Sequence, residues 1–540
     1  MICERFADRE ALVFAEERYS FLEVKQRIDE ASRYLLDIGL KPGDRLALWL
    51  PNRAEFLWYW MGAAQIGVIV VVLNTRLKLP EVTYQLEQSE SCALVLPGRP
   101  AFRDFLAEIA TLCPELRAQG PILSCAALPH LRRVIVCEQP DEAMPGVTLG
   151  ARFDAPAPAP GAPLPLATDP DAPALISYSS GTTALPKGAL ITHCVWRKGY
   201  DIGARADLTE QDRLYLCIPL FGSMAMMNAV LPLWTRGGAI VLAERFEADA
   251  FLSTVAAERC TCSHFLPPMV EALLAHTGRH DFDLSSLRIG WVLSNDRAVL
   301  EAVATALGVP GMLTGYGLTE TTTVLTRNRW DDPLEIRLTT QGFALPDVEL
   351  RIADPETGAA QPPGTPGEIW ARGYCITPGY FKKPVETAKA ITPEGWFRTG
   401  DLGVVDESGR LTYLSRLGDG YKSRGFNVSP AEVEAVLNAH QDVATSAVVG
   451  IPHEKWGAVG AAFVVPEAGA RPAPEALIDY LRPRLSSFKL PEMVVLVEEL
   501  PMTAGTGKVQ KFKLREHAMA LDAGSRPSMS EAANPLQNAK

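Results

Sequence analysis

The segment from Phe56 to Leu73 constrains the fold more than any other part of the chain. Through Ile66 it has the apolar pattern of a buried helix, and Gly67 then introduces the β-branched run from Val68 to Val72. A helix, a glycine and a buried strand in this order are what a parallel α/β sheet produces. The segment is apolar enough to suggest a membrane span, but the polar Gln65 lies in its middle, so we expect no transmembrane helix.

The alternation of helix and strand patterns extends through the first part of the chain and predicts an α/β fold with parallel sheets and covering helices. The expected elements there are a helix from Phe21 to Gly39, a strand from Asp44 to Leu50 and a helix from Pro80 to Ser89. From Arg410 onward, shorter elements indicate a small α+β domain. Its expected elements are the helices Pro430–Ala439 and Glu475–Leu485 and the strands Ala447–Ile451 and Ala461–Val465.

A chain of 540 residues exceeds what one hydrophobic core usually supports. We therefore expect a large N-terminal domain over residues 1–415 and a small mobile C-terminal domain over residues 416–520. The small and polar residues that follow predict a disordered tail over residues 521–540.

The formal net charge of −12 argues against a surface that binds polyanions, so nucleic acid is not an expected partner. The ten cysteines are scattered, and the closest group, Cys260, Cys262 and His264, lacks the second ligand pair of a zinc site. Buried free thiols in a reducing cytoplasm explain the cysteines better. The charged N-terminus lacks the apolar run of a signal peptide, so we expect a cytoplasmic location. Peripheral membrane contact and oligomer formation stay open.

A hydroxyl-rich loop follows the apolar stretch Ala174–Ile176 and carries the strongest chemical signal. Backbone N–H groups and hydroxyls of such a loop can surround phosphate oxygens, while a lysine adds a point charge. The loop is not a Walker A motif, because Pro186 precedes the lysine and Gly188 follows it. The alternative is a polar surface turn. The candidate phosphate-binding residues are Ser179, Ser180, Gly181, Thr182, Thr183 and Lys187.

This loop resembles the phosphate loop of the acyl-adenylate-forming superfamily, which includes acyl-CoA synthetases, luciferases and peptide-synthetase adenylation domains. The resemblance covers residues 4–517 in the family's motif order. It implies that Gly315–Glu320 holds the nucleotide: Tyr316 stacks on adenine, Thr319 contacts the α-phosphate and Glu320 holds Mg²⁺. The residue chemistry agrees, because flanking glycines leave the tyrosine ring uncovered and Mg²⁺ prefers a carboxylate together with phosphate oxygens.

The resemblance assigns further residues to the ribose, to the joint between the domains and to catalysis. Asp401 would accept from two ribose hydroxyls, and Arg416 would reach the ribose and phosphates. Lys508 would bridge the carboxylate and the α-phosphate as charge builds in the transition state, with Lys511 a solvated neighbour. The C-terminal domain would turn about Gly418, withdraw the catalytic lysine and present Arg424, Gly425 and Phe426 to coenzyme A.

Four departures from the family pattern put nucleotide geometry, domain rotation and substrate choice in doubt. Ala184 stands where the phosphate loop usually has glycine, and Gly418 stands where the hinge usually has aspartate or lysine. Ser294–Asp296 replaces a Gly-Gly-Ala turn, and the segment after Phe221 lacks a histidine often found beside the acyl pocket. None of these removes a reacting group.

The stretch from Pro219 to Asn228 is where the family lines its acyl pocket. Gly222 and Ser223 are small, Met226 is an adaptable apolar filler, and the stretch has no cation to pair with a second carboxylate. We therefore expect a roomy apolar slot for a medium- or long-chain fatty acid or a bulky alicyclic acid. The alternative is that these methionines fill the core while another wall sets the pocket.

The sequence thus predicts an ATP-dependent carboxylic acid:CoA ligase that uses Mg²⁺, forms an acyl-AMP intermediate and transfers the acyl group to coenzyme A. One alternative is a ligase that loads a carrier protein, which the lack of a fused carrier domain disfavours. The other is a non-catalytic sensor of acids or nucleotides, to which the four departures give some weight.

Overall fold

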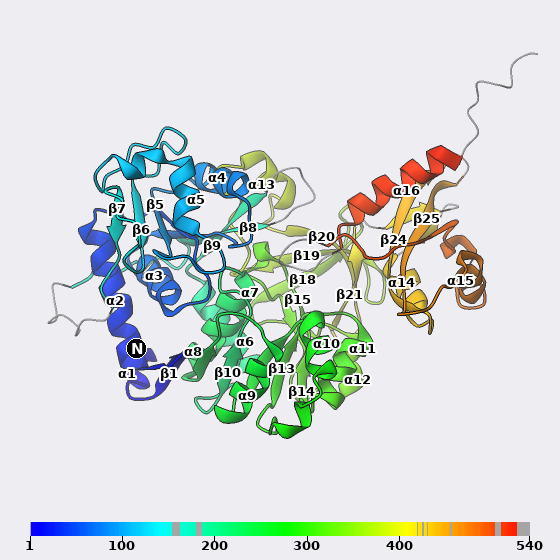
Figure 1. Cartoon of the computed structure of the whole chain (residues 1–540). Coiled ribbons are helices and arrows are strands. Elements are labelled where there is room, and N and C mark those ends of the chain that lie inside the picture. The colour runs from blue at the N-terminus through cyan, green and yellow to red at the C-terminus, as the bar shows by residue number, and fades with distance from the viewer. Residues whose placement is uncertain are drawn as a thin grey trace, which may run out of the picture. The chain divides into compact units, whose positions relative to one another are not determined.

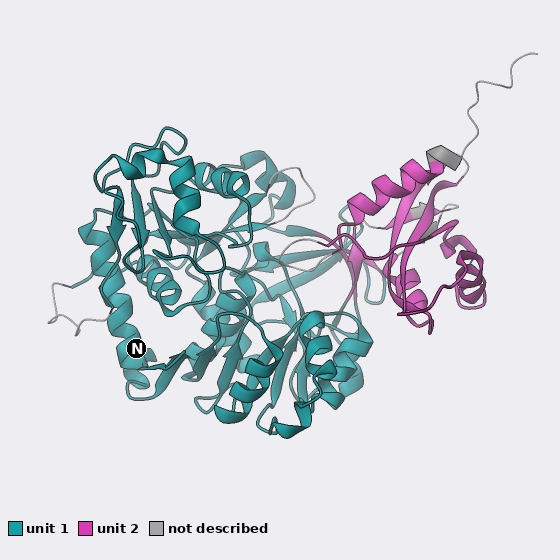
Figure 2. Cartoon of the chain, viewed as in Figure 1, with its two compact units in different colours: residues 1–365, 369–399, 405–412 teal, residues 366–368, 400–404, 413–540 magenta. Residues whose placement is uncertain are grey.

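The structure is a computed structural model, and its ribbon is shown in Figure 1. It describes residues 2–153, 163–179, 186–417, 420–423, 426–428, 430–453, 456–485, 487–502 and 509–525. The chain forms two compact units, coloured separately in Figure 2. The first unit contains residues 1–365, 369–399 and 405–412, and the second contains residues 366–368, 400–404 and 413–540.

The first unit contains two seven-stranded sheets. One has the order β7-β6-β5-β3-β4-β8-β9 and is parallel except for the antiparallel pair of β8 and β9. Its strands are β3 (Arg45–Leu48), β4 (Ile69–Val72), β5 (Ala93–Leu96), β6 (Arg133–Val136), β7 (Val147–Leu149), β8 (Pro173–Ser179) and β9 (Lys187–Thr192).

The other sheet has the order β14-β13-β12-β10-β11-β1-β2 and is parallel except for β2. Its strands are β1 (Glu10–Phe14), β2 (Glu17–Ser20), β10 (Arg213–Leu216), β11 (Ala239–Leu242), β12 (Cys262–Phe265), β13 (Ile289–Val292) and β14 (Gly311–Leu313). The N-terminal hairpin therefore completes a sheet whose other strands lie some two hundred residues later, as the pairing of Leu12 with Ile240 shows.

The predicted unit of helix, glycine and buried strand is confirmed. Helix α3 (Ala54–Gln65) ends before Gly67, whose φ of +76° is readily accessible to glycine, and β4 follows with every residue buried. Helices cover both faces of this sheet. Leu46 and Val70 pack in the cluster that contains α2 (Phe21–Asp37) and α3, whereas Ala47 packs with α4 (Leu79–Gln88) and α5 (Phe105–Leu112). Coverage of both faces explains the continuous apolar runs in the sequence.

The remaining helices of the first unit are α1 (Ile2–Arg5), α6 (Val195–Arg205), α7 (Ser223–Ala225), α8 (Leu231–Arg236), α9 (Ala248–Ala257), α10 (Pro267–Ala275), α11 (Arg297–Glu301), α12 (Leu334–Thr339) and α13 (Pro384–Ala390). Three short antiparallel strands, β15 (Gly315–Tyr316), β16 (Thr326–Arg327) and β17 (Phe343–Ala344), form a small sheet. A further sheet has the strand order β18-β19-β20-β21, which follows the order of the chain. Its strands are β18 (Val348–Ala353), β19 (Gly367–Gly373), β20 (Phe397–Val405) and β21 (Leu411–Arg416).

The second unit has its own sheet and two apolar clusters. Its elements are β22 (Tyr421–Ser423), β23 (Phe426–Val428), α14 (Pro430–Asn438), β24 (Val443–His453), β25 (Gly457–Pro466), α15 (Pro474–Leu481), β26 (Met493–Leu496) and α16 (Lys511–Ser525). These mixed elements agree with the α+β expectation. Helix α16 continues to Ser525, so residues 521–525 are helical rather than part of a tail. The rest of the expected tail lies outside the described residues.

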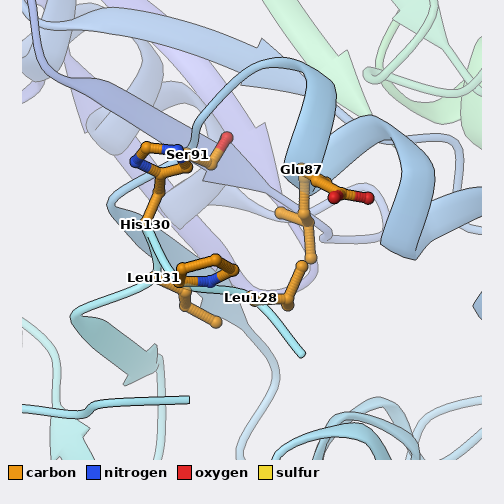
Figure 3. A pocket seen from close by; sticks show the side chains of 7 residues that line it. Glu87, Ser91, Leu128, His130 and Leu131 are labelled. Atoms are coloured by element: carbon orange, nitrogen blue, oxygen red, sulfur yellow. The ribbon is translucent and has the colours of Figure 1, made fainter. Parts of the chain in front are cut away.

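No helix among the described residues has both the length and the apolar character that a membrane crossing requires. A small hollow in the first unit lies between α4 and the chain before β6, and it contains none of the residues predicted for the site (Figure 3). Its lining consists of Leu86, Glu87, Ser91, Leu128, Pro129, His130 and Leu131.

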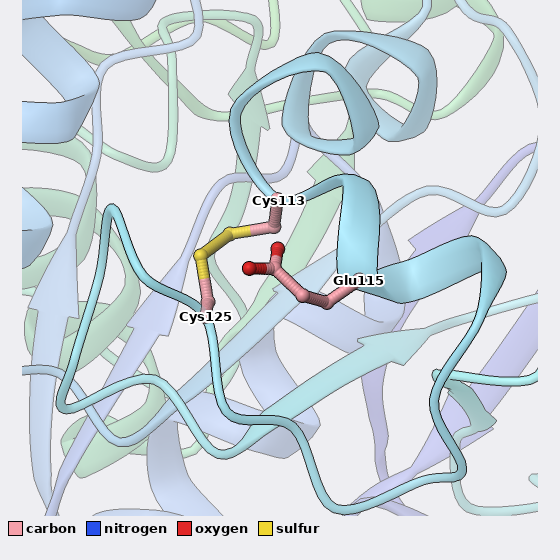
Figure 4. A group of neighbouring side chains, drawn as sticks. All are labelled: Cys113, Glu115 and Cys125. Atoms are coloured by element: carbon pink, nitrogen blue, oxygen red, sulfur yellow. A yellow bond between two sulfur atoms is a disulfide. The ribbon is translucent and has the colours of Figure 1, made fainter.

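The expectation of free thiols is wrong for two of the cysteines. Cys113 and Cys125 form a disulfide with a Cα–Cα distance of 5.6 Å, and Glu115 lies beside it (Figure 4). Both sulfur atoms are engaged in this bond, and both residues are buried in the cluster under α5. Sequence spacing does not reveal the pair, because the loop between them brings the two residues together only in the folded chain.

Candidate active site

The phosphate loop connects β8 to β9, which pair so that Ser179 lies opposite Lys187. The hydroxyl of Ser179 is buried and has no hydrogen-bond partner among the described residues, so it is available to a ligand oxygen. The predicted residues between these two, Ser180, Gly181, Thr182 and Thr183, lie outside the described residues, as does Ala184. The hairpin fixes where the loop begins and ends.

Tyr380 links Lys187 of the phosphate loop to the carboxylate of Glu320. The ammonium of Lys187 lies 4.7 Å from the centre of the Tyr380 ring, and the Tyr380 hydroxyl donates a hydrogen bond of 3.0 Å to Oε1 of Glu320. The backbone of Tyr380 forms a bridge with Ala189 in β9. One side chain therefore positions both charged groups that the sequence assigned to phosphate and Mg²⁺.

Tyr380 does not belong to any of the motifs recognised in the sequence. It follows Pro378 and Gly379, and Gly379 has a φ of +146°. Tyr316 has a glycine on each side, whereas Tyr380 has a glycine before it and Phe381 after it, so the sequence signal at Tyr380 is weaker. In addition, the pairing of this segment with β9 cannot be inferred from spacing, because the two are about 190 residues apart in sequence.

The glycines around Tyr316 are needed for backbone contacts more than for access to its ring. A Cβ atom at Gly317 would lie 1.5 Å from the carbonyl oxygen of Thr323, so no larger residue fits without movement of the chain. Tyr316 itself is buried, with 7% of its surface exposed. The turn Thr319–Thr321 follows, and Thr322 and Thr323 then adopt φ values of +53° and +71°.

Two consecutive β-branched residues in the left-handed region are unusual and costly, and such strain tends to occur at functional sites. Several bonds hold this backbone in place. The Thr322 hydroxyl donates to the carbonyl of Cys375 at 2.7 Å, and the buried ammonium of Lys198 donates to the carbonyl of Thr321. Burial lowers the pKa of Lys198. The segment that carries Thr319 and Glu320 is therefore fixed from two sides.

Glu320 fits the role of a Mg²⁺ ligand. It is 7% exposed, its backbone carbonyl accepts from the N–H of Thr377 at 2.7 Å, and its carboxylate is oriented by Tyr380. One buried, oriented carboxylate supplies the hard oxygen that Mg²⁺ combines with phosphate oxygens and water.

In the second unit, Asp401 and Arg416 form an ion pair, with 3.0 Å between Oδ1 of the aspartate and Nε of the arginine. Asp401 is buried on β20, whereas 40% of the Arg416 side chain is exposed on β21. The N–H of Leu417 donates to the carbonyl of Gly400 at 2.7 Å, which holds the two strands together beside the pair. The two residues predicted to contact the ribose are therefore neighbours.

Other predicted residues of this unit fall outside the description. Gly418, Arg424, Gly425 and Lys508 are not among the described residues, and of Phe426 only the backbone at the start of β23 is described. Lys511, expected to be solvated, instead forms an ion pair of 2.7 Å with Glu434.

The predicted acyl-pocket residues lie at the start of a continuous helical stretch. Gly222 precedes α7, Ser223 begins it, and Met226 begins a π-helical turn that ends at Val230. Met226 is completely buried in the main core cluster. The stretch itself contains no cation, as the sequence indicated, but Arg327 from β16 donates a 2.7 Å hydrogen bond to Oδ1 of Asn228 at its end.

The Ser294–Asp296 departure has a local structural role. The Asp296 carboxylate accepts from the N–H of Ala298 at 2.8 Å and caps the first turn of α11, and the Ser294 hydroxyl accepts from the N–H of Asp296 at 3.0 Å. A helix cap explains the aspartate here without a contact to nucleotide.

Comparison with known proteins places these residues in a family. Residues 2–381 match the AMP-binding enzyme family, and residues 432–508 match the AMP-binding enzyme C-terminal domain. The chain is 32% identical to "Putative acyl-CoA synthetase YngI" of Bacillus subtilis, with 96% of each chain covered.

Two further comparisons carry more specific descriptions. The chain is 34% identical to "3-[(3aS,4S,7aS)-7a-methyl-1,5-dioxo-octahydro-1H-inden-4-yl]propanoyl:CoA ligase" of Mycobacterium tuberculosis, covering 95% of this chain and 97% of that protein. The structure of the present chain resembles that of ATP-bound MatB from Rhodopseudomonas palustris, with a TM-score of 0.82 and 27% identity, covering 96% of this chain and 99% of that one. The chain belongs to the family of AMP-binding enzymes, which confirms the resemblance seen in its motifs and the prediction of an AMP-forming ligase.

Proposed function

We propose that the protein joins a carboxylic acid to coenzyme A in two steps. In the first, a carboxylate oxygen of the acid attacks the α-phosphate of ATP, which gives acyl-AMP and pyrophosphate. In the second, the thiol of coenzyme A attacks the acyl carbon, the thiol proton is lost and AMP leaves. Activation is needed because a free carboxylate has a poor leaving group. The observation that supports this function best is the linkage of Lys187 and Glu320 through Tyr380, beside the hairpin of β8 and β9.

In this proposal the first unit binds the adenine and phosphates of ATP and the acid. Lys187 and the loop residues from Ser179 to Thr183 bind phosphate oxygens, and Tyr316 stacks on adenine. Thr319 contacts the α-phosphate, and Glu320 holds Mg²⁺. The ion would neutralise charge on the pyrophosphate leaving group. The fixed backbone around Thr322 keeps these donors in place before ATP arrives, which lowers the cost of reorganisation during the reaction.

The second unit supplies the groups that change between the two steps. We propose a mobile domain over residues 416–520 that turns about Gly418. Lys508 would stabilise the charge that develops during adenylation, and Arg424, Gly425 and Phe426 would face coenzyme A during thioester formation. Asp401 and Arg416, already paired, would hold the ribose.

The acid is proposed to be a medium- or long-chain fatty acid or a bulky alicyclic acid. The choice rests on the small side chains of Gly222 and Ser223 at the start of α7. The relative in Mycobacterium tuberculosis, whose name gives a bicyclic propanoyl group as its substrate, supports the alicyclic choice.

An adenylation assay tests this function. The protein is incubated with ATP, Mg²⁺, a panel of acids and hydroxylamine, which traps acyl-AMP as a hydroxamate. Hydroxamate that depends on both acid and ATP supports an enzyme, and its absence with every acid supports a sensor. Addition of free coenzyme A should then release AMP and form a thioester. Hydroxamate without any thioester would favour loading of a carrier protein.

A further inference from the structure

A cluster of polar side chains is buried next to the predicted acyl-pocket stretch. Asn228 follows α7, His264 lies on β12, Trp291 on β13 and Arg327 on β16. Each of the first three is 1% exposed, and Arg327 is 3% exposed. An arginine this deep in a protein is normally paired with a carboxylate or fully hydrogen-bonded, because removing its charge from water is costly.

The four side chains contact one another. The guanidinium of Arg327 lies 5.6 Å from the centre of the Trp291 ring, and the ring of His264 stacks on Trp291 with 5.0 Å between centres. Arg327 also donates through Nη2 to Oδ1 of Asn228 at 2.7 Å. The aromatic rings thus form one wall, and the arginine is held against it.

Several hydrogen-bonding atoms of the cluster are unsatisfied. Nε and Nη1 of Arg327 and Nε1 of Trp291 have no partner among the described residues, and neither ring nitrogen of His264 forms a hydrogen bond of normal geometry with them. Buried groups of this kind are rare in native proteins and call for an explanation. Three of these atoms are obligate donors, because arginine and tryptophan have no acceptor in their side chains.

The charge states of the cluster also favour a ligand with acceptor oxygens. Burial, helped by the nearby cation of Arg205, lowers the pKa of Arg327 to about 9, which leaves the guanidinium charged at neutral pH. Burial and the charge of Arg327 lower the pKa of His264 to about 3, so the imidazole is neutral there. The described part of the cluster therefore carries one positive charge and an excess of donors, which is complementary to a ligand with acceptor oxygens.

The cluster contacts both the predicted acyl-pocket stretch, Pro219–Asn228, and the predicted nucleotide motif, Gly315–Glu320. Asn228 donates through Nδ2 to the sulfur of Met224 at 2.7 Å, one turn from the small residues of the acyl stretch. Arg327 pairs with Gly315 across β15 and β16, directly before the tyrosine proposed to hold adenine. A group bound at this cluster would therefore be within reach of an acid whose carboxylate points toward the nucleotide.

We propose that Arg327, together with Asn228 and His264, recognises an acceptor oxygen on the distal part of the acid, so that the preferred substrate carries a second carboxylate or a ketone in addition to the carboxylate that reacts. This proposal rests on the proposed function and narrows its substrate class. It also replaces the purely apolar slot expected from the sequence. The acyl-pocket stretch alone could not reveal the cation, because Arg327 comes from a strand 99 residues away from Asn228.

Three acids of equal length test the proposal: octanoic acid, its analogue with a ketone on the carbon next to the end, and octanedioic acid. The wild-type protein should prefer the ketone or the dicarboxylic acid to octanoic acid by about 10- to 100-fold in kcat/KM, the range for a hydrogen bond to a charged group. A preference for the diacid over the ketone would show that the second group must be an anion. The Arg327→Met variant should reduce that preference to about threefold or less, because methionine fills similar space without donors.

Arg205→Met is the matched control, since Arg205 is a half-buried arginine near the cluster that donates to the backbone carbonyls of Arg327, Phe343 and Ala344. It should lower the melting temperature and keep the order of the three acids. Calorimetric binding of the preferred acid to the full chain, without ATP turnover, provides a second measurement. Binding by the wild type that Arg327→Met abolishes would support the site even in a protein that makes no hydroxamate.

Two results would overturn the proposal. One is wild-type activity that is highest on octanoic acid, with Arg327→Met leaving the order of the acids unchanged. The other is the absence of binding by both oxygenated acids in calorimetry. The first leaves the proposed ligase function intact, because hydroxamate still forms, whereas failure to form hydroxamate with any acid would count against the ligase function itself.

Discussion

The hydroxyl of Tyr380 donates to the carboxylate of Glu320 over 3.0 Å while the ring of the same tyrosine lies 4.7 Å from the ammonium of Lys187. One residue thus fixes the distance between the positive group assigned to phosphate and the negative group assigned to Mg²⁺. Preorganised charges of this kind contribute to catalysis because they need not rearrange during the reaction.

Replacement of Tyr380 should separate its two contacts. Tyr380→Phe keeps the ring under Lys187 but loses the bond to Glu320, so we expect adenylation to slow by about 10-fold and the Mg²⁺ concentration for half-maximal rate to rise. Tyr380→Leu removes the ring as well and should also raise the KM for ATP. Tyr374→Phe is the control, because Tyr374 donates to Asp201 rather than to a site residue. Equal rates in Tyr380→Phe and wild type would show that the hydroxyl does not orient the carboxylate.

Lys508 is expected to act in the first half-reaction. Lys508→Ala should slow acyl-AMP formation by roughly 10²–10⁴-fold, the range for loss of a charge-stabilising donor, and should nearly spare thioester formation from supplied acyl-AMP. Lys511→Ala removes a nearby lysine that is paired with Glu434 and should leave adenylation close to wild type. Equal losses in both half-reactions would mean that Lys508 stays in the site throughout.

His264 should make stability depend on pH. Its pKa is about 3 in the folded chain because of burial and about 6.5 when unfolded, so the unfolded chain binds more protons between these values. Stability from this group is complete above pH of about 6.5 and decreases by about 1.4 kcal/mol per pH unit as the pH falls through that window. His264→Phe keeps a ring against Trp291 and should flatten the dependence, whereas the exposed His280→Asn should not. Parallel pH curves for wild type and His264→Phe would contradict the assignment.

The Cys113–Cys125 disulfide should stabilise the first unit. Its sequence separation of 12 residues gives an expected effect of about 2–4 kcal/mol, so a reducing agent should lower the melting temperature measured by calorimetry. The double variant Cys113→Ser, Cys125→Ser should melt lower and no longer respond to the reducing agent. A wild-type melting temperature that is insensitive to reduction would show that the bond does not form in solution.

The parts of this structure that depend on neighbouring residues could be predicted from the sequence. The turn at Gly67 and the β-branched run after it predict β4 and its sheet because both signals are adjacent in the chain. The roles proposed for Tyr316 and Glu320 rest on the resemblance of one compact motif to the family. Tyr380 and Arg327 could not be assigned in this way, because their contacts join distant parts of the chain: Tyr380 meets Lys187 and Glu320 across 193 and 60 positions, and Arg327 meets Asn228 across 99. A buried unpaired donor is visible only when all its neighbours are known.

The most direct test of the central claim follows the oxygen atoms of the acid. The preferred acid is prepared with a heavy oxygen isotope in its carboxylate and converted with ATP and coenzyme A, and the products are examined by mass spectrometry. If the acid attacks the α-phosphate, one labelled oxygen appears in the phosphate group of AMP and none appears in pyrophosphate. Label in inorganic phosphate, or AMP without label, would contradict activation through an acyl-adenylate.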